Sequence, residues 1–209
     1  MKIRLHQEDH EKGLIVIESE PQIRTIFLTS SYKYTERLAF PYVYHIIHYR
    51  KIGKKYYYFG IYDRGLMVFM NKKPIRSINS KLCFCPLEVE RFGISCTNHD
   101  KDESAYNSIS DLIGDIIGDW WQMEHLINYY SHFSPEERYD KQFLGRLKIP
   151  NYIGIPIDFW KEKNLENINE IEWSPAFTLK NSSKLKAYYP RFNNLMKINE
   201  NSKLINENI

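Results

Sequence analysis

The chain has little cysteine and no long apolar run. It contains 3 cysteines among 209 residues, and this small, odd number excludes a fold that is held together by a disulfide framework. Lys, Pro or Asp interrupts each apolar run before it reaches the about 18 residues that a membrane-spanning helix needs, which excludes a helical membrane protein. Residues 1–10 also lack the apolar segment of a secretory signal. We therefore expect a protein of a reducing, cytoplasmic compartment.

A strong excess of charge of one sign is also absent. Lys and Arg total 29 and Asp and Glu total 26, which gives a net charge of +3. Residues 1–103 carry 17 basic and 12 acidic side chains, and residues 104–209 carry 12 and 14. This asymmetry is too mild to indicate nucleic-acid binding by itself. With 43% hydrophobic and 26% charged residues, the composition excludes a disordered chain and predicts a globule with one main core.

The first half of the chain is rich in aromatic and β-branched residues, in runs that are typical of strands. These runs cover residues 22–29, 42–49, 55–62, 66–70 and 81–85. Gly53 lies in a polar turn between two of them and Gly65 precedes another, so the chain can reverse direction between neighbouring runs. We therefore expect an antiparallel β-meander.

The apolar period changes after Ser108. Apolar side chains then follow one another at steps of three and one, which places them on one face of a helix. They are Ile109, Leu112, Ile113, Ile116, Ile117 and Trp120. Ser108 and Asp111 form a capping pattern, and we expect a helix over about 107–130 that lies across the sheet. Gly114 and Gly118 weaken a helix interior, so we expect another backbone to pass close to their face.

The last third of the chain carries weaker helical signals. We expect a helix over residues 134–147, a second one over 158–168, and a helical or frayed tail over 193–209. Together the patterns predict an α+β fold: an antiparallel β-meander with a long helix packed across it, and a mostly helical C-terminal extension. We place the core domain at residues 1–133 and the extension at residues 134–209.

Two groups of residues resemble metal ligands. His45 and His48 are three apart on a predicted strand, where they face opposite sides of the sheet and cannot share an ion, so we expect half-buried or surface side chains. The second group has the order C-x-C and then C-x-x-H, and it consists of Cys83, Cys85, Cys96 and His99. Its paired cysteines are closer together than in the usual zinc knuckle, so we expect no metal and no cofactor.

Cys96 has a more specific context. It ends the step Gly93-Ile94-Ser95-Cys96, ahead of a polar loop and the long helix, and such a position can lower the pKa of a thiol. The order of meander strands, a Pro86 segment, this step and an aromatic-rich helix resembles the ubiquitin-conjugating-enzyme fold over roughly residues 40–130. It is similar in particular to divergent prokaryotic relatives that plasmids, integrative elements and phages encode. The resemblance implies a thioester on Cys96, with Asn98 and His99 in the loop beside it.

The chain also departs from that family. Its proline segment continues as Pro86-Leu87-Glu88-Val89-Glu90, without the Asn that is thought to stabilise the oxyanion in the family, and an acyl-transfer site depends strongly on such a donor. The N-terminal helix of the conjugating enzymes is not evident either. These departures favour a scaffold of this fold that has been repurposed and no longer catalyses a reaction. If a phage encodes the protein, we expect it in the host cytoplasm or in the virion.

A basic patch supports a further interpretation. Seven cations and a tyrosine combine phosphate-binding and stacking side chains: Arg50, Lys51, Lys54, Lys55, Lys72, Lys73, Arg76 and Tyr57. Lysine at hairpin tips is, however, also the ordinary protection of strand edges against aggregation. We therefore rank a non-catalytic binding or assembly module with a protein partner first, a cysteine acyl transferase second, and a nucleic-acid-binding protein third.

Overall fold

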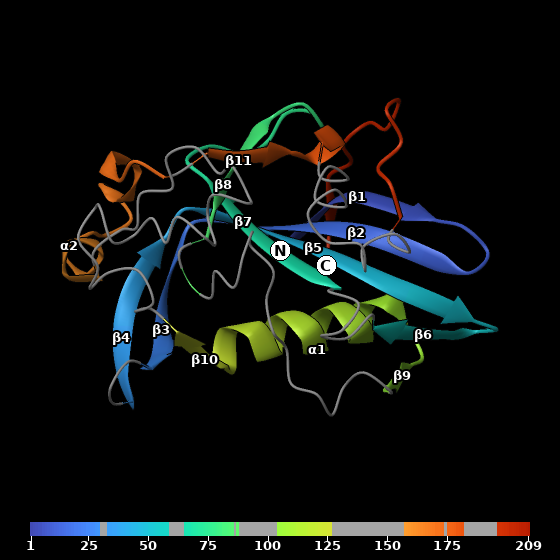
Figure 1. Ribbon diagram of the computed structural model, residues 1–209, viewed down its shortest axis with the longest axis horizontal. Coiled ribbons are helices and arrows are strands. Elements are labelled where there is room, and N and C mark those ends of the chain that lie inside the picture. The colour runs from blue at the N-terminus through green and yellow to red at the C-terminus, as the bar shows by residue number, and fades with distance from the viewer. Residues whose placement is uncertain are drawn as a thin grey trace, which may run out of the picture.

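In the described part of the chain, two sheets and one long helix make up the fold (Figure 1). The structure, a computed structural model, describes residues 1–29, 33–58, 65–85, 87, 104–126, 157–173, 175–181 and 196–209.

Nine strands form a central sheet in which all neighbours are antiparallel. Its main path has the order β11-β8-β7-β5-β2-β1-β12. The strands on this path are β1 (Lys2–Glu8), β2 (Lys12–Ser19), β5 (Tyr42–Ile52), β7 (Leu66–Asn71), β8 (Lys81–Phe84), β11 (Pro175–Thr178) and β12 (Glu207–Asn208). Beyond the path, β6 (Lys55–Tyr58) pairs with the end of β5 and with β9 (Ala105–Tyr106). The predicted antiparallel sheet is confirmed, and Gly53 turns the β5–β6 hairpin with a φ of 62°.

A second sheet of three strands leaves the meander between β2 and β5. It contains β3 (Gln22–Thr29), β4 (Lys33–Phe40) and β10 (Glu124–Leu126), in the order β10-β3-β4 with β10 parallel to β3. Pro21 lies just before β3 and Pro41 just after β4. Because proline cannot donate a ladder hydrogen bond, each one ends a strand at the point where the chain passes between the sheets.

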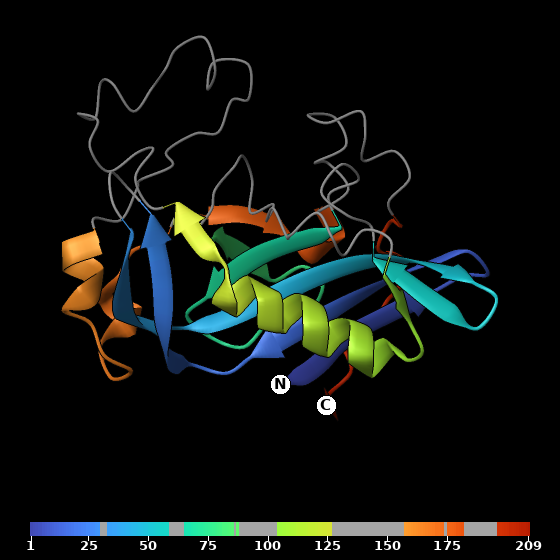
Figure 2. The same ribbon diagram turned by 90° about the horizontal axis from the view of Figure 1, so that it is seen from below.

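The helix α1 (Ile109–Gln122) packs on one face of the central sheet, as predicted (Figure 2). Ser108 is its N-cap, and the Ser108 hydroxyl accepts a hydrogen bond from the Asp111 amide at 3.1 Å. The predicted stripe is buried except for Ile109, which is partly buried. The helix ends earlier than predicted, because Met123 adopts an extended conformation and the chain continues into β10. No described residue outside α1 would lie within 4 Å of a Cβ at Gly114 or Gly118, so no described backbone passes close to their face as expected.

The central sheet is buried on both faces. Val43, Ile47 and Tyr49 of β5 belong to a core that includes α1 and the three-stranded sheet. Tyr44 and Ile46 belong to a second core on the opposite face, which residues 75–82 and 196–204 help to form. This double coverage explains why β5 reads as a nearly continuous apolar run.

The described segments near the C-terminus form short helical turns and two strands, whereas a mostly helical extension was predicted. The helix α2 (Ile157–Lys161) and a short 3₁₀ turn (Ile168–Glu170) lie in the region of the predicted helix 158–168. β11 and β12 join the central sheet, so these segments complete the core sheet. The helical or frayed tail is wrong for residues 196–209, because β12 pairs with β1 and the Ile205 amide donates to the Arg4 carbonyl at 2.9 Å. No helix in the described ranges is long and apolar enough to cross a membrane.

Candidate functional site

The three predicted catalytic residues lie outside the described part of the chain. Cys96, Asn98 and His99 belong to residues 91–103, so a thioester on Cys96 and the likeness to ubiquitin-conjugating enzymes stay predictions. Of the other cysteines, Cys83 is half-buried and Cys85 is buried. Burial raises the pKa of the Cys83 thiol above its usual value. Among the described residues, no group of three or more His, Cys, Asp or Glu side chains could hold a metal ion.

The structure splits the predicted basic patch into two groups. One group lies at the β5–β6 hairpin tip, where Ile52 pairs with Lys55. The other group follows β7, whose last residue Asn71 pairs with Tyr42 at the start of β5. At about 3.3 Å per residue along a strand, these two ends of β5 are roughly 33 Å apart. The patch is therefore two separate surfaces.

Two cations at the hairpin tip, Lys51 and Lys55, have partners in the fold. Lys51 forms an ion pair with Glu8 and lies over the Tyr56 ring, 5.9 Å from its centroid. Lys55 donates a hydrogen bond to the Asn107 side chain. Although burial opposes it, hydrogen bonds from Lys51 and Tyr49 hold the pKa of Glu8 below its usual value. Arg50 pairs across the sheet with Tyr57, on the opposite face from Lys51.

A hydrogen-bonded cluster beside the hairpin tip joins β1 to β5. The Tyr49 hydroxyl donates to Glu8 Oε2 at 2.6 Å, and His6 Nε2 lies 2.8 Å from the same hydroxyl. Gly13 of β2 makes room for the phenol, because a Cβ there would lie 2.1 Å from Tyr49 Cζ. Burial raises the pKa of Tyr49 and lowers that of His6. Both groups are therefore held in their neutral forms, and the cluster fastens two strands together.

An exposed strand edge is the clearest surface feature of the three-stranded sheet. Trp160 Nε1 donates to the Ala39 carbonyl at 2.6 Å, so this carbonyl points away from β3 and toward α2. Backbone groups two residues apart on a strand point the same way, so the N–H and C=O groups of Thr35 and Arg37 also point outward. Both residues are exposed, and no hydrogen bond from a described residue reaches these backbone groups.

Apolar side chains accompany this edge. Ile23 is 39% exposed and Phe27 is 46% exposed, on one face of β3. Their cross-strand partners on β4 are Ala39 and Thr35. Figure 1 shows β4 at the outer side of the small sheet, with α2 beside one end of it. Lys161 of α2 anchors this end through an ion pair with Glu36 at 2.7 Å.

Aromatic packing supports the other face of the three-stranded sheet. Arg24 of β3 stacks on Trp121 of α1, with its guanidinium 5.1 Å from the ring centroid, and the Phe40 ring packs edge-on against Trp121 at 5.1 Å. The His45 ring packs against Trp120 of the same helix at 5.0 Å. Burial lowers the pKa of His45 to about 3. The small sheet is thus fixed to α1 and to the central sheet, which presents the β4 edge on a rigid support.

The expectation for the two histidines is corrected in one respect. His45 and His48 are both buried, instead of half-buried or at the surface, because segments distant in sequence cover both faces of β5. Sequence reasoning also missed the β4 edge. The sequence feature that could have indicated this edge is the run Lys33-Tyr34-Thr35-Glu36-Arg37 ahead of Pro41. In the structure its side chains alternate between exposed and half-buried.

Comparison with known proteins adds no relative. No protein-family model, curated protein or solved structure matches the chain.

Proposed function

We propose that this protein is a non-catalytic binding module that takes up an extended strand of a protein partner at the edge of β4. The observation that carries this proposal is the exposed backbone of Thr35 and Arg37, which presents outward N–H and C=O groups on a rigid sheet. A strand that adds to such an edge gains main-chain hydrogen bonds, and its alternate side chains provide specificity.

The neighbouring side chains define the chemistry of the partner strand. Phe27 and Ile23 offer apolar surface on the outer face of the small sheet, and this surface favours β-branched or aromatic side chains in the partner. Arg37 is exposed on the same face and forms no ion pair with a described residue. An acidic side chain opposite Arg37 would add a favourable charge pair. The expected partner segment therefore carries apolar and acidic side chains at every second position, so that all of them lie on the face that meets Phe27 and Arg37.

Support from the sheet reduces the cost of binding. Trp160 and Lys161 of α2 hold one end of β4, through Ala39 and Glu36 respectively. The edge is thus already ordered before a partner arrives, so only the partner strand loses conformational freedom. Protection of an edge strand by Arg37 is the competing explanation of the same surface, and the experiment below separates the two.

Selection from a displayed library of random extended peptides tests the proposal. The selected peptide is titrated against the wild type, Thr35→Pro and Thr35→Val by fluorescence anisotropy. Thr35→Pro removes the outward N–H without touching the ladder to β3, so we expect about a tenfold or greater loss of affinity. Thr35→Val keeps the N–H and should bind like the wild type.

Three results would contradict the proposal. The first is that no peptide is enriched. The second is that the Thr35→Pro variant, with an unchanged thermal unfolding curve, binds as well as the wild type. The third is a wild-type dimer that Thr35→Pro dissociates in light scattering, because this would assign the edge to a second copy of the chain.

A further inference from the structure

We infer that a second surface, formed by the β7–β8 connection and the neighbouring end of β11, binds the phosphate backbone of duplex nucleic acid. This inference goes beyond the proposed strand-binding function and uses different residues. The surface, called the basic edge below, consists of Lys72, Lys73, Arg76, Lys81 and Lys180. Three of these cations belong to the basic patch that the sequence shows, and the fold adds the other two.

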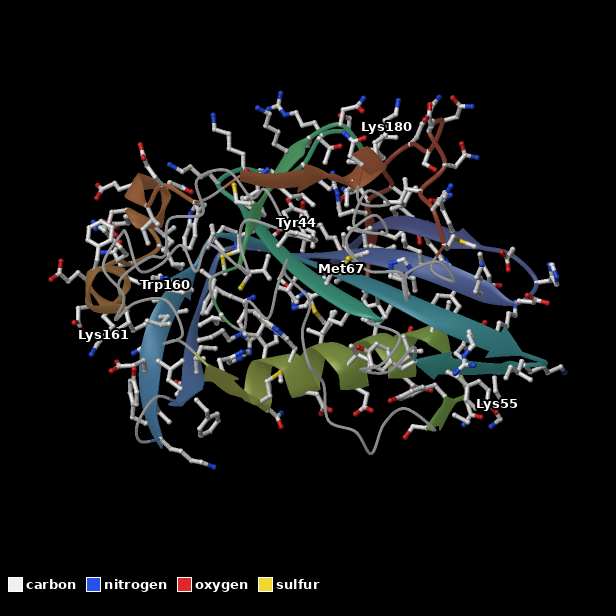
Figure 3. All side chains as sticks on the ribbon, in the orientation of Figure 1. Tyr44, Lys55, Met67, Trp160, Lys161 and Lys180 are labelled. Carbon is white, nitrogen blue, oxygen red and sulfur yellow. The ribbon has the colours of Figure 1, made fainter. Side chains whose placement is uncertain are left out.

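Contacts between distant segments bring the five cations together. Asn71 Nδ2 donates to the Lys81 carbonyl at 2.8 Å, which closes the connection between β7 and β8. Lys81 pairs across the sheet with Thr178 of β11. The Lys180 amide donates to the Ile78 carbonyl at 2.9 Å, so Lys180 lies against the same connection. In Figure 3, Lys180 is labelled on the edge of the molecule where many nitrogen-tipped side chains project, away from Lys55.

Most of these charges have no ion-pair partner among the described residues. Lys180 lies 3.4 Å from Glu200, a carboxylate that is itself largely exposed. Within the described part of the chain, no ion pair involves Lys72, Lys73, Arg76 or Lys81. At the hairpin tip, by contrast, Lys51 forms an ion pair with Glu8, and Lys55 donates a hydrogen bond to the neutral Asn107 side chain. Positive potential therefore concentrates at the basic edge.

The connection that carries these cations is held in one conformation. Ser80 Oγ accepts hydrogen bonds from the amides of Arg76 and Ser77 at 3.1 and 3.2 Å. The Ile75 amide donates to the Tyr44 hydroxyl at 2.9 Å, and Arg4 donates to the Ile75 carbonyl at 2.8 Å. Ile75 itself is buried in the second core. An ordered connection presents its cations at fixed spacing, and less entropy is lost on binding than with a free loop.

The side chains around the cations select the class of polyanion. No aromatic residue occurs in residues 71–81 or 178–181, so the segments that carry these cations supply no stacking platform of the kind by which proteins hold unpaired bases. None of the exposed large hydrophobic side chains among the described residues lies in these segments, so they also supply no apolar anchor of the kind that a membrane-surface segment has. Cations with serine and asparagine donors fit contacts to phosphates, which are independent of sequence. A duplex meets these conditions.

Anisotropy titration of a labelled random-sequence DNA duplex, at several salt concentrations, tests this inference. The first variant combines Lys72→Glu, Lys73→Glu and Arg76→Glu. The control combines Arg50→Glu, Lys54→Glu and Lys55→Glu, which changes the net charge by the same amount at the hairpin tip. We expect the first variant to lose about tenfold or more in affinity and to bind with a shallower salt dependence, since each lost phosphate contact reduces the slope by about 0.9. The control should stay within about threefold of the wild type.

Other outcomes contradict the inference. Equal losses in the two variants would show a general effect of net charge, and wild-type binding without salt dependence would exclude phosphate contacts. Tighter binding to single-stranded DNA or to anionic lipid vesicles would assign the basic edge to another partner. If the glutamate variant is unfolded by circular dichroism, the matched glutamine variants at the same positions provide the comparison.

Discussion

At the scale of single residues, two glycines with different surroundings predict opposite effects of the same substitution. Gly13 lies under the Tyr49 ring, and a Cβ there would approach Tyr49 Cζ to 2.1 Å. Gly114 lies in α1 and is exposed, and no described residue outside this helix would lie within 4 Å of a Cβ at this position. The requirement at position 13 therefore comes from packing, and the glycine in α1 meets no such requirement.

We expect Gly13→Ala to destabilise the protein by about 1–3 kcal/mol, because the ring must move and its hydrogen bonds to Glu8 and His6 are strained. Gly114→Ala should instead stabilise it by roughly 0.4–1 kcal/mol, since alanine restricts the unfolded chain and favours the helix. Urea unfolding monitored by tryptophan fluorescence measures both. A Gly13→Ala variant as stable as the wild type would contradict the packing argument.

At the scale of elements, the sequence predicts what depends on local periodicity. The stripe from Leu112 to Trp120 specifies both the helix and its buried face, because a helix of this length carries several periods of its own pattern. The chain forms β3 and β4 in a second sheet because β2 pairs directly with β5. No local sequence pattern predicts this pairing between strands that are distant in the chain. Pro21 and Pro41 mark the two points of departure, and they acquire this meaning only once the pairing is known.

The candidate sites show the same difference between what local sequence predicts and what depends on contacts between distant segments. Composition and spacing are enough to group Lys72, Lys73 and Arg76, because these residues are close in sequence and lie in the one connection between β7 and β8. They could not reveal Lys180, since its place beside Ile78 depends on contacts between segments that are far apart in the chain. They also could not separate Lys51 from this group, because its partner Glu8 comes from another hairpin.

The packing of α1 on β5 predicts a dependence of stability on pH. Burial lowers the pKa of His45 to about 3, and it lowers that of His125 to about 4. In the unfolded chain each histidine takes up a proton near pH 6.5, whereas in the folded chain it stays neutral. The stability that depends on the neutral histidines is therefore complete above about pH 6.5, and it is lost as the pH falls toward the pKa values of the folded protein. At about pH 5, each of these two histidines has lowered the free energy of unfolding by roughly 2 kcal/mol.

We expect His45→Phe to lose roughly 2 kcal/mol less stability than the wild type between about pH 7 and pH 5, because phenylalanine takes up no proton. Urea unfolding at a series of pH values measures the difference. His10, which is exposed, provides the control, and His10→Gln should keep the wild-type slope. Parallel slopes for the wild type and His45→Phe would show that His45 is not held neutral.

At the scale of the whole molecule, the two proposed surfaces lie on different parts of one framework. The β4 edge belongs to the three-stranded sheet, near Lys161, and the basic edge lies near Lys180 on the central sheet, as Figure 3 shows. Strand addition at one surface leaves the other uncovered, so the geometry allows a protein strand and a duplex to be held together.

The C-terminal segment, residues 196–209, packs beside the N-terminal strand β1. The N- and C-termini lie side by side (Figure 2), and the Ile209 amide donates to the Met1 carbonyl at 3.3 Å. Arg4 Nη1 donates to the Asn206 side chain at 3.0 Å. Ile198 is buried in the second core. The segment 196–209 therefore covers one face of the sheet and pairs with its outermost long strand, β1.

We expect deletion of residues 196–209 to destabilise the protein by roughly 2–5 kcal/mol, because it exposes the apolar surface around Ile198 and removes the pairing of β1. Deletion of residues 207–209 alone is the matched control, since it removes only the two-residue strand β12 and keeps both Ile198 and Asn206; its effect should stay below about 1 kcal/mol. Urea unfolding gives both values. Because both deletions remove the pairing of β12 with β1, the difference between them measures the apolar cover around Ile198. Equal stability of the longer deletion and the full chain would mean that the second core holds without its C-terminal cover.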